Sequence, residues 1–222
     1  MAVRIMHAVL IIVLILAALI VAATIAIGAP PVMGGARPRA TEPAHIVVDT
    51  LNLTHWLGKG DLRGAGLTLE SVLSTIEKTA SVLRAKYPGR VMYVVKDRES
   101  VLNDSAARVA YADAAMKHSV YIYAVERYEN PPTALLTKSH THSAKGRDDL
   151  YMALLAGRWK CPVLTEDRFR DFDEFRADVG PFHVYEFAFW RALPSRDYVR
   201  PSALRALKKP RAVRYEGVIP KK

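Results

Sequence analysis

The sequence predicts an α/β fold: a three-layer sandwich with a parallel sheet of about five strands, preceded by one N-terminal transmembrane helix. Three observations support this prediction. From residue 45 onward, short apolar runs alternate with longer amphipathic segments, which is typical of βαβ units. The earliest apolar runs have no regular polar positions, as strands covered on both faces require. Residues 8–27 form one long run without a charge.

Residues 8–27 predict a membrane anchor. At about 1.5 Å per residue, this run spans roughly 30 Å, the thickness of the hydrocarbon core of a bilayer. The apolar core of a cleaved signal peptide is usually about 7 to 15 residues, so an uncleaved anchor is the favoured interpretation. We therefore expect residues 1–28 to hold an anchor in a lipid bilayer. Residues 29–44, rich in Gly and Pro, are expected to form a tether.

The predicted domain covers residues 45–190. Its first strand ends at Asp49, and the first long helix begins at an N-cap, Thr68, and stops before Pro88-Gly89. Strands and helices then alternate: a strand over 90–97, a helix over 104–117, a strand over 119–126, a helix over 148–159, a strand over 161–167, a helix over 170–180 and a strand over 182–190.

The single cysteine, Cys161, excludes an intrachain disulfide and favours a reducing compartment. The prediction is a single-pass membrane protein whose domain faces the cytosol. The chain has neither the Gly-x-Ser-x-Gly elbow of serine hydrolases nor the Gly-x-x-x-x-Gly-Lys of P-loop proteins, so neither class is indicated.

The net charge of +10 is concentrated near the C-terminus. Residues 41–190 hold 19 basic and 20 acidic side chains, whereas residues 191–222 hold ten basic and two acidic ones. We expect residues 191–222 to form a basic tail outside the domain. Such a tail suits a polyanion (RNA, DNA or an anionic lipid surface) or a protein partner, and a solvated tail is the open alternative.

Several acids lie where the predicted strands end. Asp49 ends the first strand, Asp167 ends the fourth, and Asp148-Asp149 begin the helix that leads into the fourth. The carboxyl ends of parallel strands share one edge of a sheet, so these acids meet in one cleft if the first and fourth strands are neighbours. Grouped carboxylates repel each other unless a cation is present, and hard oxygen ligands suit Mg²⁺ or Mn²⁺. Taken singly, each acid could instead cap a helix.

The same motifs resemble those of PIN-like nucleases. The run "IVVDTLN" resembles their first-strand Asp-x-x-Asn, and "GRDDLYMALLA" followed by "CPVLTEDRFRDF" resembles the Asp-Asp helix and acid-ended strand of the NYN branch, which includes Regnase-type endoribonucleases. The resemblance covers roughly residues 45–175. It implies a metal-dependent ribonuclease in which water attacks the RNA backbone. The implied metal ligands and catalytic residues are Asp49, Asp148, Asp149 and Asp167, with Asn52 orienting Asp49 or a bound water.

Four cations are candidate RNA contacts. Arg168 and Arg170 follow the fourth strand and carry the charge that a scissile phosphate would need. Lys145 and Arg147 precede the acidic helix and could guide a phosphate backbone towards it. Trp56 could stack on a base, although a packing role is the simpler interpretation.

Two functions are the leading candidates, ahead of a nucleic-acid-binding module that uses the acids only for fold stability. The first is a membrane-anchored, Mg²⁺- or Mn²⁺-dependent endoribonuclease that cleaves single-stranded or loop RNA. The second is a catalytically silent PIN-fold protein that serves as a membrane-anchored structural or assembly component, for example of a virion. Departures from the family pattern favour the second: Thr50 follows Asp49 where Gly is frequent, and Glu166 precedes Asp167 where Asn is common.

Overall fold

The computed structural model describes residues 44–58, 68–97, 104–126, 146–173, 182–191 and 194–220. The predicted membrane span over residues 8–27 lies outside these ranges. Among the helices within them, none is long and apolar enough to cross a membrane. Residues 42–222 form one compact unit, and the fold of this unit is described below.

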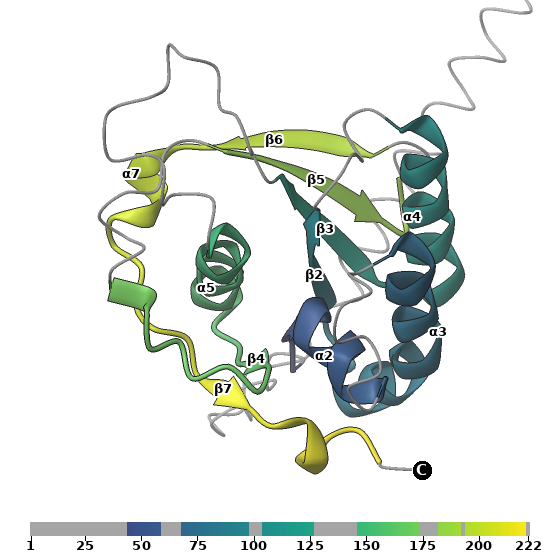
Figure 1. The fold of residues 1–222 in the computed structure, drawn as a ribbon, viewed down its shortest axis with the longest axis horizontal. Helices are drawn as coiled ribbons and strands as arrows, with labels where there is room; N and C mark the ends of the chain where they lie inside the picture. The colour runs from purple at the N-terminus through teal and green to yellow at the C-terminus, as the bar shows by residue number, and fades with distance from the viewer. Residues whose placement is uncertain are drawn as a thin grey trace, which may run out of the picture. The chain divides into compact units, whose positions relative to one another are not determined.

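A seven-stranded mixed sheet runs through the described part of the domain, in the order β6-β5-β3-β2-β1-β4-β7 (Figure 1). Neighbouring strands from β3 to β7 are parallel, whereas β5 and β6 run antiparallel to their neighbours. The strands are β1 (Ile46–Asp49), β2 (Val91–Asp97), β3 (Tyr121–Glu126), β4 (Val163–Leu164), β5 (Phe182–Ala188), β6 (Ser195–Val199) and β7 (Ala212–Val213).

Helices cover both faces of the sheet, which makes the three layers that the sequence predicts (Figure 1). One core lies between the sheet and α2, α3 and α4, and it contains Leu53, Ile76 and Tyr111. The other lies between the sheet and α5 and α7, and it contains Leu150 and Leu204. The helices are α2 (Thr50–Leu57), α3 (Leu69–Lys86), α4 (Ser105–His118), α5 (Arg147–Trp159) and α7 (Pro201–Leu204), with a 3₁₀ turn, η3 (Tyr215–Gly217).

Local sequence signals explain where the helices begin and end. Thr68 caps α3 by accepting a hydrogen bond from the backbone N–H of Ser71, whose hydroxyl accepts one from the Thr68 N–H. The predicted cap of α3 is therefore confirmed. Asp104 caps α4 by accepting a hydrogen bond from the backbone N–H of Ala106. Ser119 and Lys160 end α4 and α5 in the left-handed conformation, a common way of ending a helix.

The predicted sheet of about five parallel strands was wrong in number and partly in direction. The fifth strand, β5, is antiparallel to β3: it starts opposite Val125 and ends opposite Tyr121. The chain leaves β4 on the side of the sheet where the carboxyl ends of the parallel strands lie. It enters β5 on that same side, so β5 must run in the opposite direction to β3. The predicted helix over residues 170–180 lies mostly outside the described residues.

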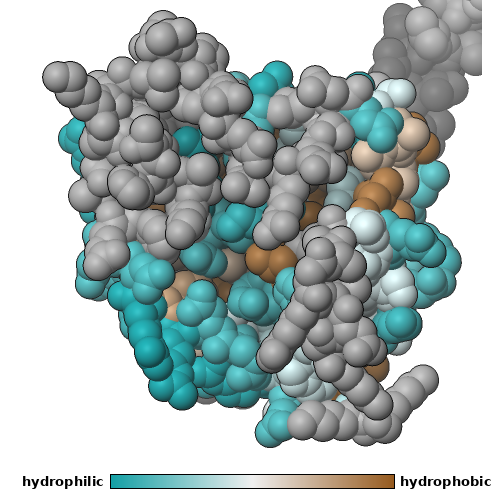
Figure 2. Space-filling view, in the orientation of Figure 1, coloured by the Kyte–Doolittle hydropathy of each residue, from teal (hydrophilic) through white to brown (hydrophobic). Residues whose placement is uncertain are grey.

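Residues 191–222, expected to be a tail outside the domain, supply part of the fold instead. They contribute the helix α7 and the strands β6 and β7, which are the two edge strands of the sheet. Tyr215, Val218 and Ile219 are buried in the first core. The cations of this segment are mostly exposed, and the surface at the lower left of Figure 2, near β7 in Figure 1, is hydrophilic. Because the segment is rich in charged residues, the sequence did not indicate that these three residues pack into the core.

Candidate functional site

Strands β1 and β4 are neighbours, as convergence of the acids requires. They pair in parallel, with Val47 opposite Val163 and Val48 opposite Leu164. The residues that follow each strand therefore emerge side by side at one edge of the sheet. Asp49 comes from β1, and Thr165 to Asp167 come from the end of β4.

Asp49 is a buried carboxylate held by several donors. Its Oδ1 accepts a hydrogen bond from the Asn52 backbone N–H at 3.1 Å, so that Asp49 also caps α2. Its Oδ2 accepts hydrogen bonds from the Thr165 hydroxyl at 2.6 Å and from the side-chain amide of Asn52. Asn52 thus contacts the carboxylate that the family resemblance expects it to orient. These contacts fix the position of the carboxylate before any ligand binds.

The carboxylate of Asp148 forms an ion pair with Lys96. Asp148 lies in the first turn of α5 and is 6% exposed, and its Oδ1 is 3.3 Å from the Lys96 Nζ on β2. Within the part of the chain that the structure describes, this buried oxygen accepts no hydrogen bond of good geometry. A buried carboxylate needs a positive charge nearby, and Lys96 supplies one here.

The acids are close enough to shift one another's ionisation. Burial is the largest cause that raises the pKa of Asp149 to about 8; the negative charges of Asp148, Asp49 and Asp167 act in the same direction, and Lys96 opposes them. Burial also raises the pKa of Asp49 to about 6, against the lowering effect of its hydrogen bonds. Asp149 is therefore protonated at neutral pH when no cation is bound, which is the response of crowded carboxylates.

The backbone of Asp167 contacts the same Thr165 hydroxyl that binds Asp49. Its N–H donates to the Thr165 hydroxyl at 2.9 Å, while Oδ1 accepts from the Phe169 N–H at 2.9 Å. Phe169 has a φ of 49°, so the Asp167 side chain stabilises a left-handed turn. Glu166 points elsewhere: it accepts from the Tyr215 N–H and pairs with Arg214 at 3.3 Å. The acidic end of β4 therefore serves both the site and the attachment of the C-terminal segment.

The four aspartates have the donor chemistry that a hard divalent cation prefers. Among the described residues, however, no three His, Cys, Asp or Glu side chains are grouped tightly enough to hold one ion between them. Mg²⁺ is commonly bound in proteins by only one or two carboxylates, with water and substrate phosphate as its other ligands. The donor set therefore fits an ion that keeps much of its hydration shell.

The predicted RNA contacts fall into three groups. Arg168 and Arg170 are exposed, and Arg168 lines a pocket of about 370 Å³ together with Trp56, Glu166, Arg214 and Glu216. Arg147 is buried, at 4% exposed, with its guanidinium 6.0 Å from the centroid of the Phe182 ring; its contact with RNA stays a prediction. Lys145 lies outside the described residues.

Three residues of the site were missed by sequence reasoning. Lys96 is the one charged side chain inside "VMYVVKD" before its last residue, and a lysine ending a buried strand is a usable signal. Thr165 was hidden between an apolar run and two acids. Tyr215, whose hydroxyl donates to the Asp49 carbonyl at 3.4 Å and whose ring lies 5.4 Å from that of Trp56, was assigned to the tail.

Comparison with known proteins identifies no relative. The chain matches no protein-family model, no curated protein and no solved structure. The resemblance of its motifs to those of PIN-like nucleases stays a prediction.

Proposed function

We propose that the domain is a PIN-like, metal-dependent endoribonuclease, anchored in a membrane through residues 8–27 and facing the cytosol. The observation that carries this proposal is the placement of aspartates from β1, α5 and the end of β4 at one end of the sheet, where the Thr165 hydroxyl contacts both Asp49 and the Asp167 backbone. The raised pKa of Asp149, caused by burial and by the charges of the other three aspartates, agrees with this placement. Carboxylates drawn from three separate elements to one sheet edge cost stability, and a cation-binding role explains why the fold tolerates that cost.

The residues of the chain have distinct roles in this proposal. Asp49, Asp148, Asp149 and Asp167 would hold Mg²⁺ or Mn²⁺ directly or through bound water. The ion would supply positive charge beside the scissile phosphate and lower the pKa of water. Thr165 and Asn52 hold Asp49 in position. Because Asp149 keeps a proton at neutral pH without a cation, cation binding displaces that proton.

The substrate would approach beside Arg168. The pocket that Arg168 lines lies next to Glu166 at the end of β4 and is bordered by the Trp56 ring. A second cation, Arg214, lines the same pocket and pairs there with Glu166. Cations and an aromatic ring are the groups that bind a single-stranded RNA backbone and its bases. We therefore propose single-stranded or loop RNA as the substrate class.

One observation favours the second candidate, a catalytically silent member of the fold. The Lys96 ammonium lies against Asp148, and a fixed cation can neutralise a carboxylate cluster in place of a metal ion. In that case the acids stabilise the fold, and the domain serves as a membrane-anchored structural or assembly component.

Cleavage of labelled single-stranded RNA by the full chain in mild detergent, with and without millimolar Mn²⁺, separates the two candidates. The endoribonuclease predicts Mn²⁺-dependent internal cleavage that an Asp49→Asn, Asp167→Asn variant loses. An Asp171→Asn variant, which changes an exposed neighbouring acid, is the matched control and should cleave normally. Absence of cleavage by folded protein, under both conditions and across several RNA sequences, would favour the silent candidate.

A further inference from the structure

The sheet edge opposite the candidate site carries a cluster of aromatic rings around one cation. The Arg90 guanidinium lies 3.9 Å from the Trp159 ring centroid, 4.5 Å from that of Tyr121 and 5.4 Å from that of Trp190. Arg90 precedes β2 and Tyr121 begins β3, so the cluster lies where the parallel strands start. We call Arg90, Tyr121, Trp159, Phe189 and Trp190 the aromatic cluster.

Part of the aromatic cluster is open to solvent. Phe189 is 39% exposed and Trp190 is 49% exposed, and their rings contact each other edge to face at 4.9 Å. They follow β5, which ends at this edge because it runs antiparallel to β3. These two large rings are exposed to solvent beside a cation. Covering them with a partner is favourable because it removes apolar surface from water.

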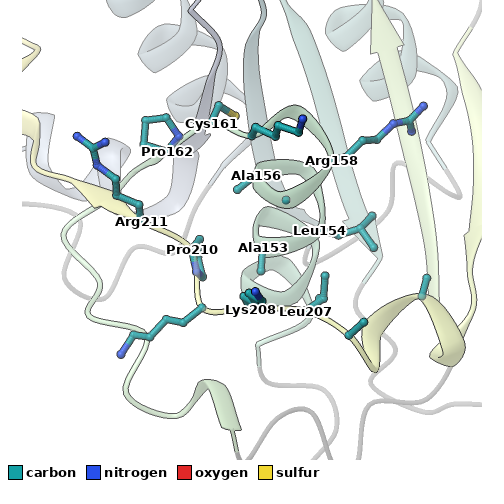
Figure 3. Close-up of a pocket in the computed structure, with 15 residues that line it drawn as sticks. Ala153, Leu154, Ala156, Arg158, Cys161, Pro162, Leu207, Lys208, Pro210 and Arg211 are labelled. Carbon is teal, nitrogen blue, oxygen red and sulfur yellow. The ribbon is translucent and has the colours of Figure 1, made fainter.

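A basic groove lies beside the aromatic cluster. It has a volume of about 560 Å³ and runs between α5 and the segment that joins α7 to β7 (Figure 3). Its floor is built from small or apolar residues such as Ala153, Ala156 and Leu207. Among the described residues that line it, none is acidic, and five are cations: Arg158, Lys160, Lys208, Lys209 and Arg211.

The groove and the aromatic cluster form one continuous face. Arg158 lines the groove and lies 5.7 Å from the centroid of the Trp159 ring. Lys160 follows directly and is exposed. We call the two parts together the basal face. Helix α5 runs from the candidate site at its first turn to the basal face at its last.

The chain enters the domain at the basal face. The Gly89 N–H donates to the Ala44 carbonyl at 3.0 Å, and the His45 ring lies 5.3 Å from that of Trp159. Residues 28–44 separate this point from the predicted span. A Gly- and Pro-rich sequence of that length is expected to span roughly 20 to 50 Å. A span in the bilayer would thus keep the basal face close to the lipid headgroups.

We propose that the basal face binds the surface of an anionic lipid bilayer and turns the candidate site away from it. Each lysine or arginine near an anionic surface adds to the attraction, and so does tryptophan at the headgroup level. The attraction is expected to fade with added salt because surface charges are screened. The proposal needs no nuclease activity, and it stands or falls separately from the site at the other edge.

Tryptophan fluorescence of the full chain, reconstituted in vesicles that contain brominated lipid, tests the proposal. The chain has three tryptophans, and Trp56→Phe leaves only Trp159 and Trp190, both in the aromatic cluster. We expect strong quenching in phosphatidylcholine vesicles with about a third phosphatidylserine, and at least twofold weaker quenching in pure phosphatidylcholine or in high salt.

Charge variants identify the groove as the cause. Lys208→Gln with Lys209→Gln should at least halve the quenching in anionic vesicles. Lys78→Gln with Arg200→Gln, which removes two exposed cations outside the basal face, should not change it. Circular dichroism checks that both variants are folded. Two results would overturn the proposal. One is equal quenching of the protein in neutral and anionic vesicles; the other is equal quenching of the two variants in anionic vesicles. A tenfold loss of RNA affinity in the groove variant with unchanged quenching would assign the groove to nucleic acid instead.

Discussion

The hydroxyl of Thr165 donates a 2.6 Å hydrogen bond to Asp49 Oδ2 and thereby joins the ends of β4 and β1. The same hydroxyl accepts the backbone N–H of Asp167. One oxygen therefore positions two of the four candidate ligands. It also lowers the pKa of Asp49, because a hydrogen bond donated to a carboxylate stabilises its charged form.

Replacing Thr165 by Val should remove these contacts while keeping the shape of the side chain. We expect a loss of about 1 to 2 kcal/mol in unfolding free energy, since Asp49 stays buried with one donor fewer. RNA cleavage should fall by about tenfold or more, because Asp49 loses its fixed position. Urea unfolding and cleavage assays measure both effects. Thr165→Ser keeps the hydroxyl and should behave like the parent protein. If Thr165→Val also behaves like the parent, the hydrogen bond between Thr165 and Asp49 has no role in stability or cleavage.

A divalent cation should stabilise the folded protein. At ten times its dissociation constant, a ligand that binds only the folded state adds about 1.4 kcal/mol, or about 3 to 6 °C in melting temperature for a domain of this size. Calorimetry at pH 7 with MnCl₂ or MgCl₂ measures the shift. The Asp148→Asn, Asp149→Asn variant should lose it, whereas Asp171→Asn should keep it. A melting temperature that does not respond to either ion would contradict the metal site.

The stability of the metal-free protein should fall as pH rises from about 4 to 8. Asp149 has a pKa of about 8 when folded against an ordinary value of 3.8, so over this range the folded state keeps a proton that the unfolded state has lost. Asp49 contributes in the same sense only up to about 6. Asp149→Asn should therefore remove most of the slope between pH 6 and 8, which for one group is at most about 1.4 kcal/mol per pH unit, and should stabilise the protein at pH 8. Chemical unfolding at several pH values measures this, and an unchanged slope would contradict it.

Replacing Lys96 by Met should leave the buried Asp148 carboxylate without its cation. We expect the metal-free protein to lose about 2 to 4 kcal/mol in unfolding free energy at neutral pH. Added Mn²⁺ should recover part of the loss, because the cluster becomes more negative and binds the ion more tightly. Lys96→Arg keeps the charge and is the control. If Mn²⁺ binds the Met variant but not the parent, Lys96 occupies the place of the ion and the silent candidate gains support.

Tyr215 should be as important to stability as a residue of the central core. It is fully buried, and its ring packs against Trp56. Tyr215→Ala should cost about 3 to 5 kcal/mol, as for other large aromatic residues. Tyr215→Phe removes the hydroxyl, which donates to the Asp49 carbonyl at 3.4 Å and contacts Thr165, and should cost about 1 kcal/mol. Denaturant unfolding distinguishes the two. A small loss for the Ala variant would mean that the C-terminal segment is not part of the folded core.

The layered fold could be predicted because its elements carry strong local signals. The cap at Thr68 and the continuous apolar runs of β1, β2 and β3 each depend on neighbours in sequence. The direction of β5 depends on which edge of the sheet the chain occupies when it leaves β4, and this is set by tertiary packing. In the C-terminal segment, exposed cations outnumber the buried Tyr215, Val218 and Ile219, so charge masked the packing signal.

The candidate site could be predicted in part. The acids stood out because parallel strands bring their carboxyl ends to one edge, and the pairing of β1 with β4 met the condition on which their convergence depended. The partners of those acids were invisible. Thr165 and Lys96 are ordinary polar residues in sequence, and they matter only because pairing across the sheet brings them to Asp49 and Asp148.

Strand β7 pairs with β4 over only two residues, and the segment behind it is fastened by Glu166 and by the Tyr215 hydroxyl on the Asp49 carbonyl. So short a ladder belongs to the parts of a protein that open first, well below global unfolding. A ligand that orders Asp49 and the end of β4 would therefore also order the segment from Arg214, which contacts Glu166, back to Arg211, which lines the basic groove. Tryptic cleavage after Arg211 and amide exchange around it would then report occupancy of the candidate site from the groove.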